Sequence, residues 1–415
     1  MKKTILATIV LFSQLSAIAD HHLFKSYSMN CEVLLGGELY LQGGTRIQNK
    51  KDRLYKVTKN NNDVGFDSSA TAHITIKNKN FDNWSYGLQL ALNTNNISNS
   101  GAGQSYLDRT YLWIEREKYG KIEIGSNISA ASAMQINGAS VAVATGGIDG
   151  AWAKYVNSDT DSLRDENFIT YPGLLFHETN FEDTGSHERS RKITYYSQKW
   201  QGFQFGASYI PDVDNKGSSV IMSTTGTGGN RQEKNAVASG ITWEKELAPH
   251  RELKIALTGE CAKSNRSTAD KTNGRVYYNA RAIELGGTYR HDSIQVGASY
   301  GTHWDSNIQK IAAGGVSNGF FYSAGIKYDI NSNTRTSLSY FYSEKFQNPM
   351  DIVSIGVEHE LAPGFLPYAE ITHLNMKQKF NYTDIAFNAN GQSTLSPSNY
   401  KNKATAIIIG TKMSF

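Results

Sequence analysis

Apolar and polar residues alternate along most of this chain, which is the pattern of β-strands whose two faces meet different surroundings. The alternation is clearest in residues 84–92, 253–258 and 405–415, where one face collects mostly apolar and aromatic side chains. Stretches of helical period and comparable length are missing after residue 20. The pattern therefore predicts an all-β fold, with a first strand that begins near Val33.

Two kinds of break separate these runs, and they alternate along the chain. Seven breaks are short: residues 80–83, 118–120, 200–202, 248–250, 291–293, 330–333 and 362–364. Eight are mostly longer and are polar or glycine-rich: 48–65, 96–104, 128–189, 211–232, 263–275, 305–317, 346–349 and 378–402. Seven turns and eight loops predict sixteen strands. An even strand number, with short turns at one end and long loops at the other, is typical of a barrel that spans an outer membrane.

A sheet that crosses a bilayer must close, because hydrocarbon offers no hydrogen bonds to the backbone groups of an open edge. The outward face of each strand should then be apolar with aromatic residues near its ends, and the inward face polar. The chain has 23 Tyr, 17 Phe and 6 Trp, and many lie at predicted strand ends, such as Trp113, Tyr289 and Phe415. A secreted β-sandwich or β-helix does not explain the regular succession of short and long breaks. We therefore predict a 16-stranded antiparallel transmembrane β-barrel.

The first nineteen residues have the features of a secretory signal peptide. An initial Lys-Lys pair precedes the apolar stretch 4–15, and Ala17-Ile18-Ala19 matches the small-x-small cleavage rule. The apolar stretch is too short for a membrane-spanning anchor helix. We expect residues 1–19 to be removed on export. Removal lowers the net charge from +4 to +2 and leaves one barrel domain, residues 20–415, in the outer membrane.

Composition narrows the alternatives. Charged residues make up 19% of the chain, below the roughly 25% of average globular proteins, which argues against a disordered solvated chain. The 42 basic and 38 acidic residues form no Lys/Arg block, so we expect no nucleic-acid partner. Two cysteines are too few for a disulfide scaffold or a zinc ribbon. No His-Glu-x-x-His motif occurs, and we predict no cofactor, no metal site and no enzymatic activity.

Several stretches resemble the Gram-negative general porins. Residues 108–114 (DRTYLWI) and 119–125 (YGKIEIG) look like the family's fourth and fifth strands. Residues 193–197 followed by 202–209 (GFQFGASY) resemble its sixth and seventh strands, and Phe415 is similar to the terminal Phe that the family uses in assembly. The resemblance implies a homotrimeric porin that contacts outer-membrane lipid and lipopolysaccharide.

A sixteen-stranded barrel leaves a water-filled lumen, so the segment that narrows it decides what passes. In the porin family the third loop folds inward, and the resemblance implies this role for the 62-residue break 128–189. Its acidic residues are candidate constriction residues: Asp149, Asp159, Asp161, Asp165 and Glu166. Strand parity places four basic residues on the lumen side: Arg46, Lys77, Arg109 and Lys192. Arg109 also lies at the position of the family's constriction arginine. Opposed charges would set a transverse field that favours small polar solutes.

The sequence therefore predicts an outer-membrane porin for passive diffusion of ions and small hydrophilic solutes. Three other hypotheses stay open. A substrate-specific channel would show an aromatic slide or a basic ring in the lumen, and an adhesin would use its long loops as the working surface. An outer-membrane enzyme would need a Ser/His pair at one lipid-facing edge.

Overall fold

The computed structural model of the protein describes residues 21–26, 31–48, 63–80, 83–93, 107–156, 168–176, 190–213, 232–265, 276–306, 308, 310, 319–387 and 393–415. The N-terminal nineteen residues predicted as a signal peptide lie outside these ranges, so that prediction stays a prediction.

Strands dominate the described chain. Their bounds are β1 His21–Ser26, β2 Cys31–Gln48, β3 Val64–Asn80, β4 Trp84–Asn93, β5 Leu107–Arg116, β6 Gly120–Ser126, β7 Arg191–Tyr196, β8 Phe203–Asp212, β9 Gln232–Ala248, β10 Arg251–Asn265, β11 Ala280–His291, β12 Ile294–Thr302, β13 Phe320–Asp329, β14 Thr334–Lys345, β15 Asn348–His359, β16 Phe365–Phe387 and β17 Ser393–Ser414. Four short helical segments lie between β6 and β7: α1 Ala130–Met134, η3 Gly138–Val141, η4 Gly147–Asp149 and α2 Trp152–Tyr155.

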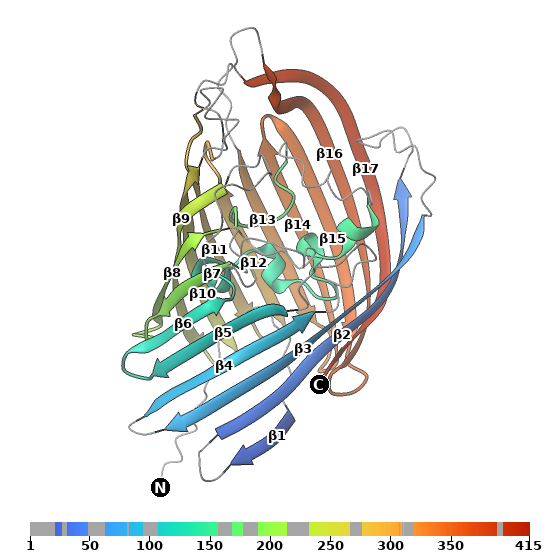
Figure 1. Ribbon diagram of the computed structural model, residues 1–415. Helices are drawn as coiled ribbons and strands as arrows, with labels where there is room; N and C mark the ends of the chain where they lie inside the picture. Colours follow the sequence, from blue (N-terminus) through green and yellow to red (C-terminus); the bar gives the residue numbers. More distant parts are fainter. Residues whose placement is uncertain are drawn as a thin grey trace.

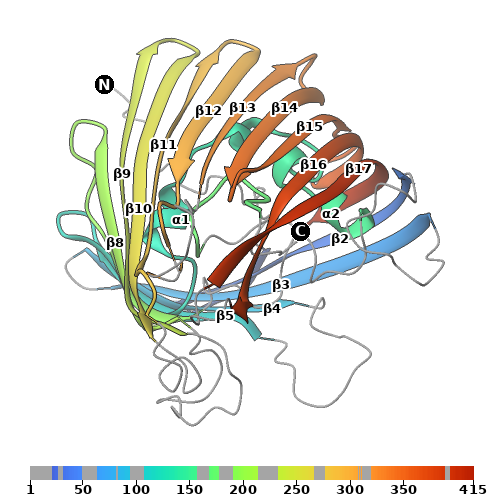
Figure 2. The same cartoon turned by 90° about the horizontal axis from the view of Figure 1, so that it is seen from above.

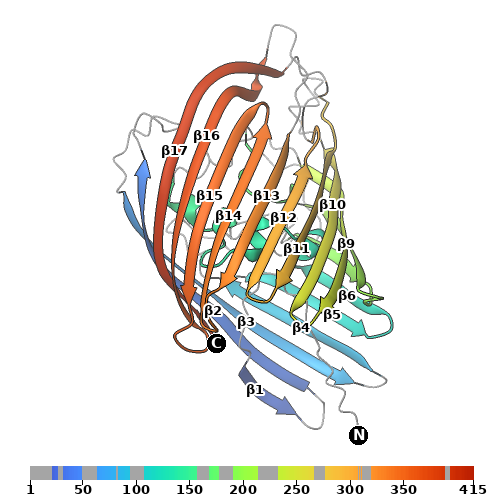
Figure 3. The ribbon, with the colours of Figure 1, turned by 180° about the vertical axis from the view of Figure 1, so that it is seen from behind.

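Sixteen of these strands close into a barrel (Figures 1 and 3). Each strand from β2 to β17 pairs antiparallel with its neighbours in the chain, and β17 returns to pair with β2. This confirms the predicted sixteen-stranded antiparallel barrel. Strand β1 is an addition that the sequence pattern did not predict; it pairs with the first residues of β2, below the point where β17 joins.

All seven predicted short breaks separate consecutive strands. The predicted loop 346–349 is shorter than expected, because only Phe346 and Gln347 lie between β14 and β15. The predicted break 378–402 is wrong: β16 continues to Phe387, and β17 begins again at Ser393. These strands rise above the rest of the barrel (Figures 1 and 3), where lipid no longer demands an apolar outward face. Their polar sequence is therefore compatible with either a strand or a loop.

The two faces of the barrel wall differ as a bilayer requires. Outward side chains such as Ile355, Leu285 and Ile409 are exposed, the last by 66%. The inward face is less uniformly polar than predicted. On the inner side of β13 to β17, large apolar residues are completely buried, among them Phe321 and Leu374. They are buried because residues 148–156 and 168–169 of the long third loop pack against them inside the barrel.

Candidate functional site: the lumen and its inner loop

The third loop follows the inner wall around much of the barrel (Figure 2). Helix α1 contacts β7 to β10, η3 contacts β12 to β14, η4 contacts β14 to β16, and α2 contacts β17 and β2. The path therefore runs along the side of the barrel that lies across from β4 and β5.

Local capping explains why this loop forms short turns. The Ser129 side chain accepts a hydrogen bond from the Ser132 N–H at the start of α1. At η3, the Asn137 side chain accepts from the N–H groups of Ala139 and Ser140, and the Ser140 hydroxyl accepts from the Asn137 N–H. Such reciprocal capping satisfies the backbone donors that a helix start leaves unpaired.

Serines on the inward faces of the strands hold the loop backbone. Their hydroxyls accept hydrogen bonds from loop N–H groups at donor–acceptor distances of 2.8 to 3.3 Å: Ala130 to Ser208, Gly138 to Ser323, Val143 to Ser337 and Ile148 to Ser339. These bonds come from strands β8, β13 and β14. They fix the loop to the wall at several separated points, which a loop exposed only to water would not need.

Glu370 on β16 accepts more hydrogen bonds from the loop than any of these four serines. Its buried carboxylate accepts from the Thr145 N–H at 3.1 Å, the Gly147 N–H at 3.2 Å and the Thr145 hydroxyl at 2.7 Å. The hydroxyl of Thr372 donates to the same carboxylate at 3.3 Å. A second carboxylate, that of Glu358, accepts from the Ala144 N–H at 2.9 Å. The loop's middle section is thus bound to β15 and β16.

Two glycines let the loop backbone reach the wall. A Cβ on Gly286 would lie 1.7 Å from the Ile136 carbonyl oxygen, and one on Gly325 would lie 2.3 Å from the Gly138 carbonyl oxygen. Both distances are far shorter than a van der Waals contact. The absent side chains therefore leave the space in which residues 136–138, which lead from α1 into η3, are seated.

The loop returns along the same wall through residues 168–176. The Phe176 N–H donates to the Glu260 carboxylate at 2.9 Å, and the Pro172 carbonyl accepts from the Asn137 side chain at 3.2 Å. Just beyond β12, His303 donates from Nε2 to the Gly173 carbonyl oxygen at 2.9 Å. Burial lowers the pKa of His303 to about 4, so the imidazole is neutral at pH 7.

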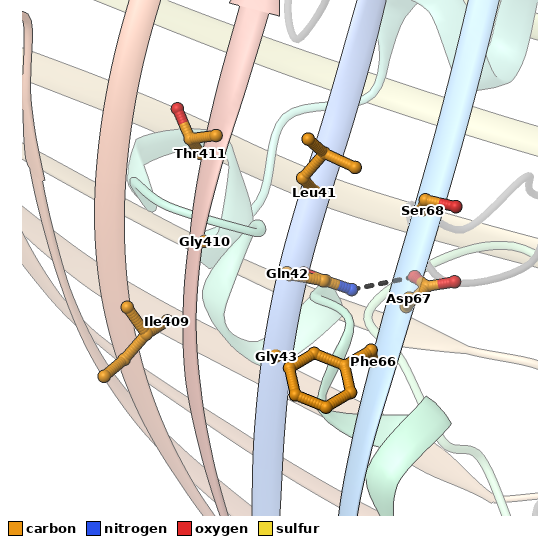
Figure 4. Close-up of a pocket in the computed structure, with 9 residues that line it drawn as sticks. All are labelled: Leu41, Gln42, Gly43, Phe66, Asp67, Ser68, Ile409, Gly410 and Thr411. Carbon is orange, nitrogen blue, oxygen red and sulfur yellow. Dashed lines mark hydrogen bonds between the residues drawn. The ribbon is translucent and has the colours of Figure 1, made fainter.

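Helix α2 attaches the loop to the strands where the barrel closes, β17 and β2, and to the next strand, β3. Lys154 Nζ lies 2.7 Å from Asp67 Oδ2 on β3. The Gln42 side chain on β2 donates to the same carboxylate at 2.9 Å, the bond drawn in Figure 4. Burial, together with the charge of Asp67, raises the pKa of Tyr155 to about 12. Leu41, which Figure 4 shows beside Gln42, is exposed on the outer face.

The four predicted basic residues do not form one ring. Arg109 is half-buried and lies opposite Ala91 on β4. Lys192 on β7 pairs with Gly125 on β6. Gly125 pairs in turn with Tyr111, which is two residues after Arg109 on β5. Arg109 and Lys192 therefore belong to neighbouring rows of the wall. Lys192 is only 4% exposed, and its Nζ donates to the Asn127 carbonyl at the root of the loop.

Arg46 and Lys77 lie near opposite ends of β2 and β3. Arg46 is buried, with Nε 3.2 Å from Asp63 at the loop end of the barrel. Lys77 Nζ lies 3.1 Å from Glu32 near the turn end. Both are on the inward face, but they are too far apart along the strands to act on a solute at the same level.

One predicted acid is described. Asp149 ends η4 and is only 4% exposed, among the contacts of that turn with β14 to β16. Asp159, Asp161, Asp165 and Glu166 lie outside the described residues, so their place at the constriction stays a prediction.

Sequence reasoning missed the other inward side chains of β3 to β5. His73 on β3 lies one strand away from Ala91, which lies opposite Arg109. The Tyr111 hydroxyl donates to the Gln89 side chain at 2.5 Å. These side chains alternate along their strands in step with Arg109 and Lys77, which predicts that they face inward. Charge alone does not select them, because only basic and acidic residues were expected to set the field of the lumen.

Among the described residues, no helix combines the length and apolarity that crossing a bilayer requires. The sequence signature of the family described as Gram-negative porin matches residues 6–379. Uncharacterised proteins of Rickettsia bellii and Rickettsia conorii are 28% identical over 457 positions and 27% identical over 464, with all of each chain covered.

Two solved structures share the fold at low identity. An anion-selective porin from Comamonas acidovorans has a TM-score of 0.59 and 14% identity, and the match covers 93% of this chain and 100% of that one. The outer membrane channel DcaP of Acinetobacter baumannii has a TM-score of 0.52 and 13% identity, with 94% and 99% covered. The chain therefore belongs to the Gram-negative porin family, and its barrel is an outer-membrane channel through which solutes diffuse.

Proposed function

We propose that the third loop narrows this channel to a constriction between itself and the wall formed by β3 to β6. Ions and small hydrophilic solutes then pass by passive diffusion, and larger ones are excluded. The observation that carries the proposal is the attachment of the loop inside the barrel by inward serines and by Glu370. A loop held at this many points acts as a fixed partition of the lumen.

Arg109 is the residue proposed to set the charge of the constriction. It lies on the wall across from the loop, and its half-buried guanidinium belongs to the inward face. The predicted acids of the loop, including Asp149 and those at 159–166, would supply the opposite charge. Such a transverse field orders the dipoles of polar solutes and tunes ion selectivity. Arg46, Lys77 and Lys192 would contribute to the field of the lumen from greater distances or from buried positions.

Assembly and partners follow the family. A homotrimer, contact with lipopolysaccharide, and export with removal of residues 1–19 are proposed on the resemblance of the chain to porins. Transport is proposed to involve no chemical conversion. Gly297-Ala298-Ser299-Tyr300-Gly301 has the spacing of a hydrolase nucleophile motif, but it lies within strand β12, not at a strand-to-helix turn. The Ser299 hydroxyl bonds to that of Ser323 at 2.8 Å.

Single-channel conductance and reversal potential of the refolded protein test the proposal. We expect ohmic channels whose conductance changes in three equal steps, one for each pore of the trimer. In Arg109→Ala, we expect the reversal potential under a salt gradient to shift. Arg281→Ala is the matched control, because Arg281 lies on the outer face of β11, beside Trp304. Equal reversal potentials for both variants would remove Arg109 from the constriction. A well-folded barrel without openings would favour the adhesin hypothesis.

A further inference from the structure

A groove with one polar and one apolar side lies on the outer face of the barrel, at its turn end. Its volume is about 380 Å³, and it is lined by Arg251, Tyr289, His291, Ile294 and Val296. These residues come from three consecutive strands, β10, β11 and β12. Ile294 and Val296 are 43% and 40% exposed, like the other apolar side chains of the outward face.

The strand register puts all five lining residues on one face of the sheet. Arg251 lies directly opposite His291, and His291 lies opposite Ile294. Two residues away along the same strands, Tyr289 lies opposite Val296. Residues that are directly opposite, or two apart on one strand, point to the same side of a sheet. The groove is therefore polar on its β10–β11 side and apolar on its β12 side.

The groove lies at the level where the barrel meets the periplasmic leaflet, because the short turns of such barrels face the periplasm. Arg251 is the first residue of β10, and His291 is the last residue of β11. The next outward row along these strands consists of Leu253, Tyr289 and Val296. Polar residues at the strand ends thus lie beside the lipid headgroups, and the row above them lies beside the acyl chains.

The turns beside the polar side of the groove are bonded to each other. The Asp292 N–H in the β11–β12 turn donates to the His250 carbonyl oxygen in the β9–β10 turn at 3.0 Å. On β11, the rings of Tyr289 and His291 stack with centroids 6.4 Å apart. Asp292 Oδ2 lies 3.8 Å from His291 Nδ1 and offsets positive charge on that imidazole. Arg251 therefore supplies the positive charge of a groove whose polar side is preorganised.

We propose that this groove binds the phosphodiester group of a phospholipid in the periplasmic leaflet. A guanidinium donates two parallel hydrogen bonds to phosphate oxygens, so Arg251 is the anchoring residue. The Tyr289 hydroxyl and the His291 ring supply further donors in the same groove. Ile294 and Val296 pack against the first carbons of the acyl chains. A free phosphate ion would use only the polar side, which is why a lipid is the favoured occupant. The site lies outside the lumen and does not depend on the constriction.

Native mass spectrometry of the refolded protein, titrated with phosphatidylglycerol or with diacylglycerol of the same acyl chains, tests the proposal. Loss of hydrogen bonds to a charged group in Arg251→Gln should weaken phosphatidylglycerol binding about tenfold or more and leave diacylglycerol binding unchanged. Arg251→Lys, which keeps the charge but not the planar fork, should lose less. Arg281→Gln is the matched control, because it removes an exposed arginine from the outer face of β11 at the loop end. Unchanged conductance and heat-modifiable migration verify folding.

Equal affinity of the wild type and Arg251→Gln for phosphatidylglycerol would overturn the proposal. So would an equal loss in Arg281→Gln, since the attraction would then be general to the outer wall, or an equal loss with diacylglycerol, since phosphate would then play no part. Glycerophosphoglycerol, the headgroup without acyl chains, is the competitor. If it displaces the lipid at equal concentration, the apolar side contributes nothing and the groove is a site for a soluble phosphate ester.

Discussion

Removal of the Glu370 carboxylate should release the middle of the inner loop without unfolding the barrel. In Glu370→Ala, the N–H groups of Thr145 and Gly147 lose their acceptor inside the barrel. An unsatisfied buried donor costs about 1–3 kcal/mol, so two cost about 4 kcal/mol. At about 1.4 kcal/mol for each factor of ten, the open population of this segment should rise roughly a thousandfold. Hydrogen exchange of the two amides measures that population directly.

Glu370→Gln is the matched variant, because it keeps the size of the side chain and one acceptor oxygen. Its oxygen can accept from the two amides, while its NH₂ group can donate to the hydroxyls of Thr145 and Thr372, which rotate to accept. We expect exchange to accelerate no more than about tenfold in this variant, the cost of losing the charge. Wild-type exchange rates in Glu370→Ala would refute the anchoring role. Equal acceleration in both variants would show that charge, not hydrogen bonding, holds the loop.

Three further changes follow from particular geometries. Gln347 has a φ of 62° in the two-residue β14–β15 turn, so Gln347→Gly should raise the free energy of unfolding by about 1 kcal/mol, measured in urea. Burial lowers the pKa of His303 to about 4. Its contribution to the free energy of unfolding should therefore be fully present above about pH 6.5, and up to about 3 kcal/mol of it should be lost as the pH falls towards 4. His303→Gln should flatten this dependence in unfolding experiments, and exchange at the amides around Gly173 should follow it. Gly286→Ala should displace the loop and increase conductance and current noise, whereas Gly259→Ala, whose added Cβ would meet nothing closer than 3.3 Å, should leave both unchanged.

The barrel could be predicted because its cause is local. Each membrane-crossing strand needs one apolar face, and each turn needs breaking residues, so the alternation in 84–92 or 405–415 is visible in the sequence itself. The same reasoning fails above the membrane. Around Lys377 on β16 and Lys401 on β17, lysines take the outward positions that hold apolar residues in the membrane-crossing strands. The sequence therefore does not indicate that these two residues pair in a β-ladder.

The path of the inner loop could not be predicted, because long-range contacts decide it. Gly138 bonds to Ser323, and Thr145 to Glu370, across about two hundred residues of chain. Inward serines and glycines give no pattern that distinguishes a loop-binding wall from a wall that faces water. The apolar inner face around Phe321 likewise contradicts the expectation of a polar lumen, and only the loop that covers it explains it.

Solute permeation measures the central claim most directly. Liposomes that contain the refolded protein are placed in isotonic solutions of neutral sugars of increasing size, and the initial swelling rate is recorded. A lumen narrowed by a fixed loop should pass monosaccharides readily, and the rate should fall steeply towards tri- and tetrasaccharides. Swelling rates that do not depend on sugar size, or no swelling from liposomes whose barrels are fully folded, would contradict a constricted diffusion channel.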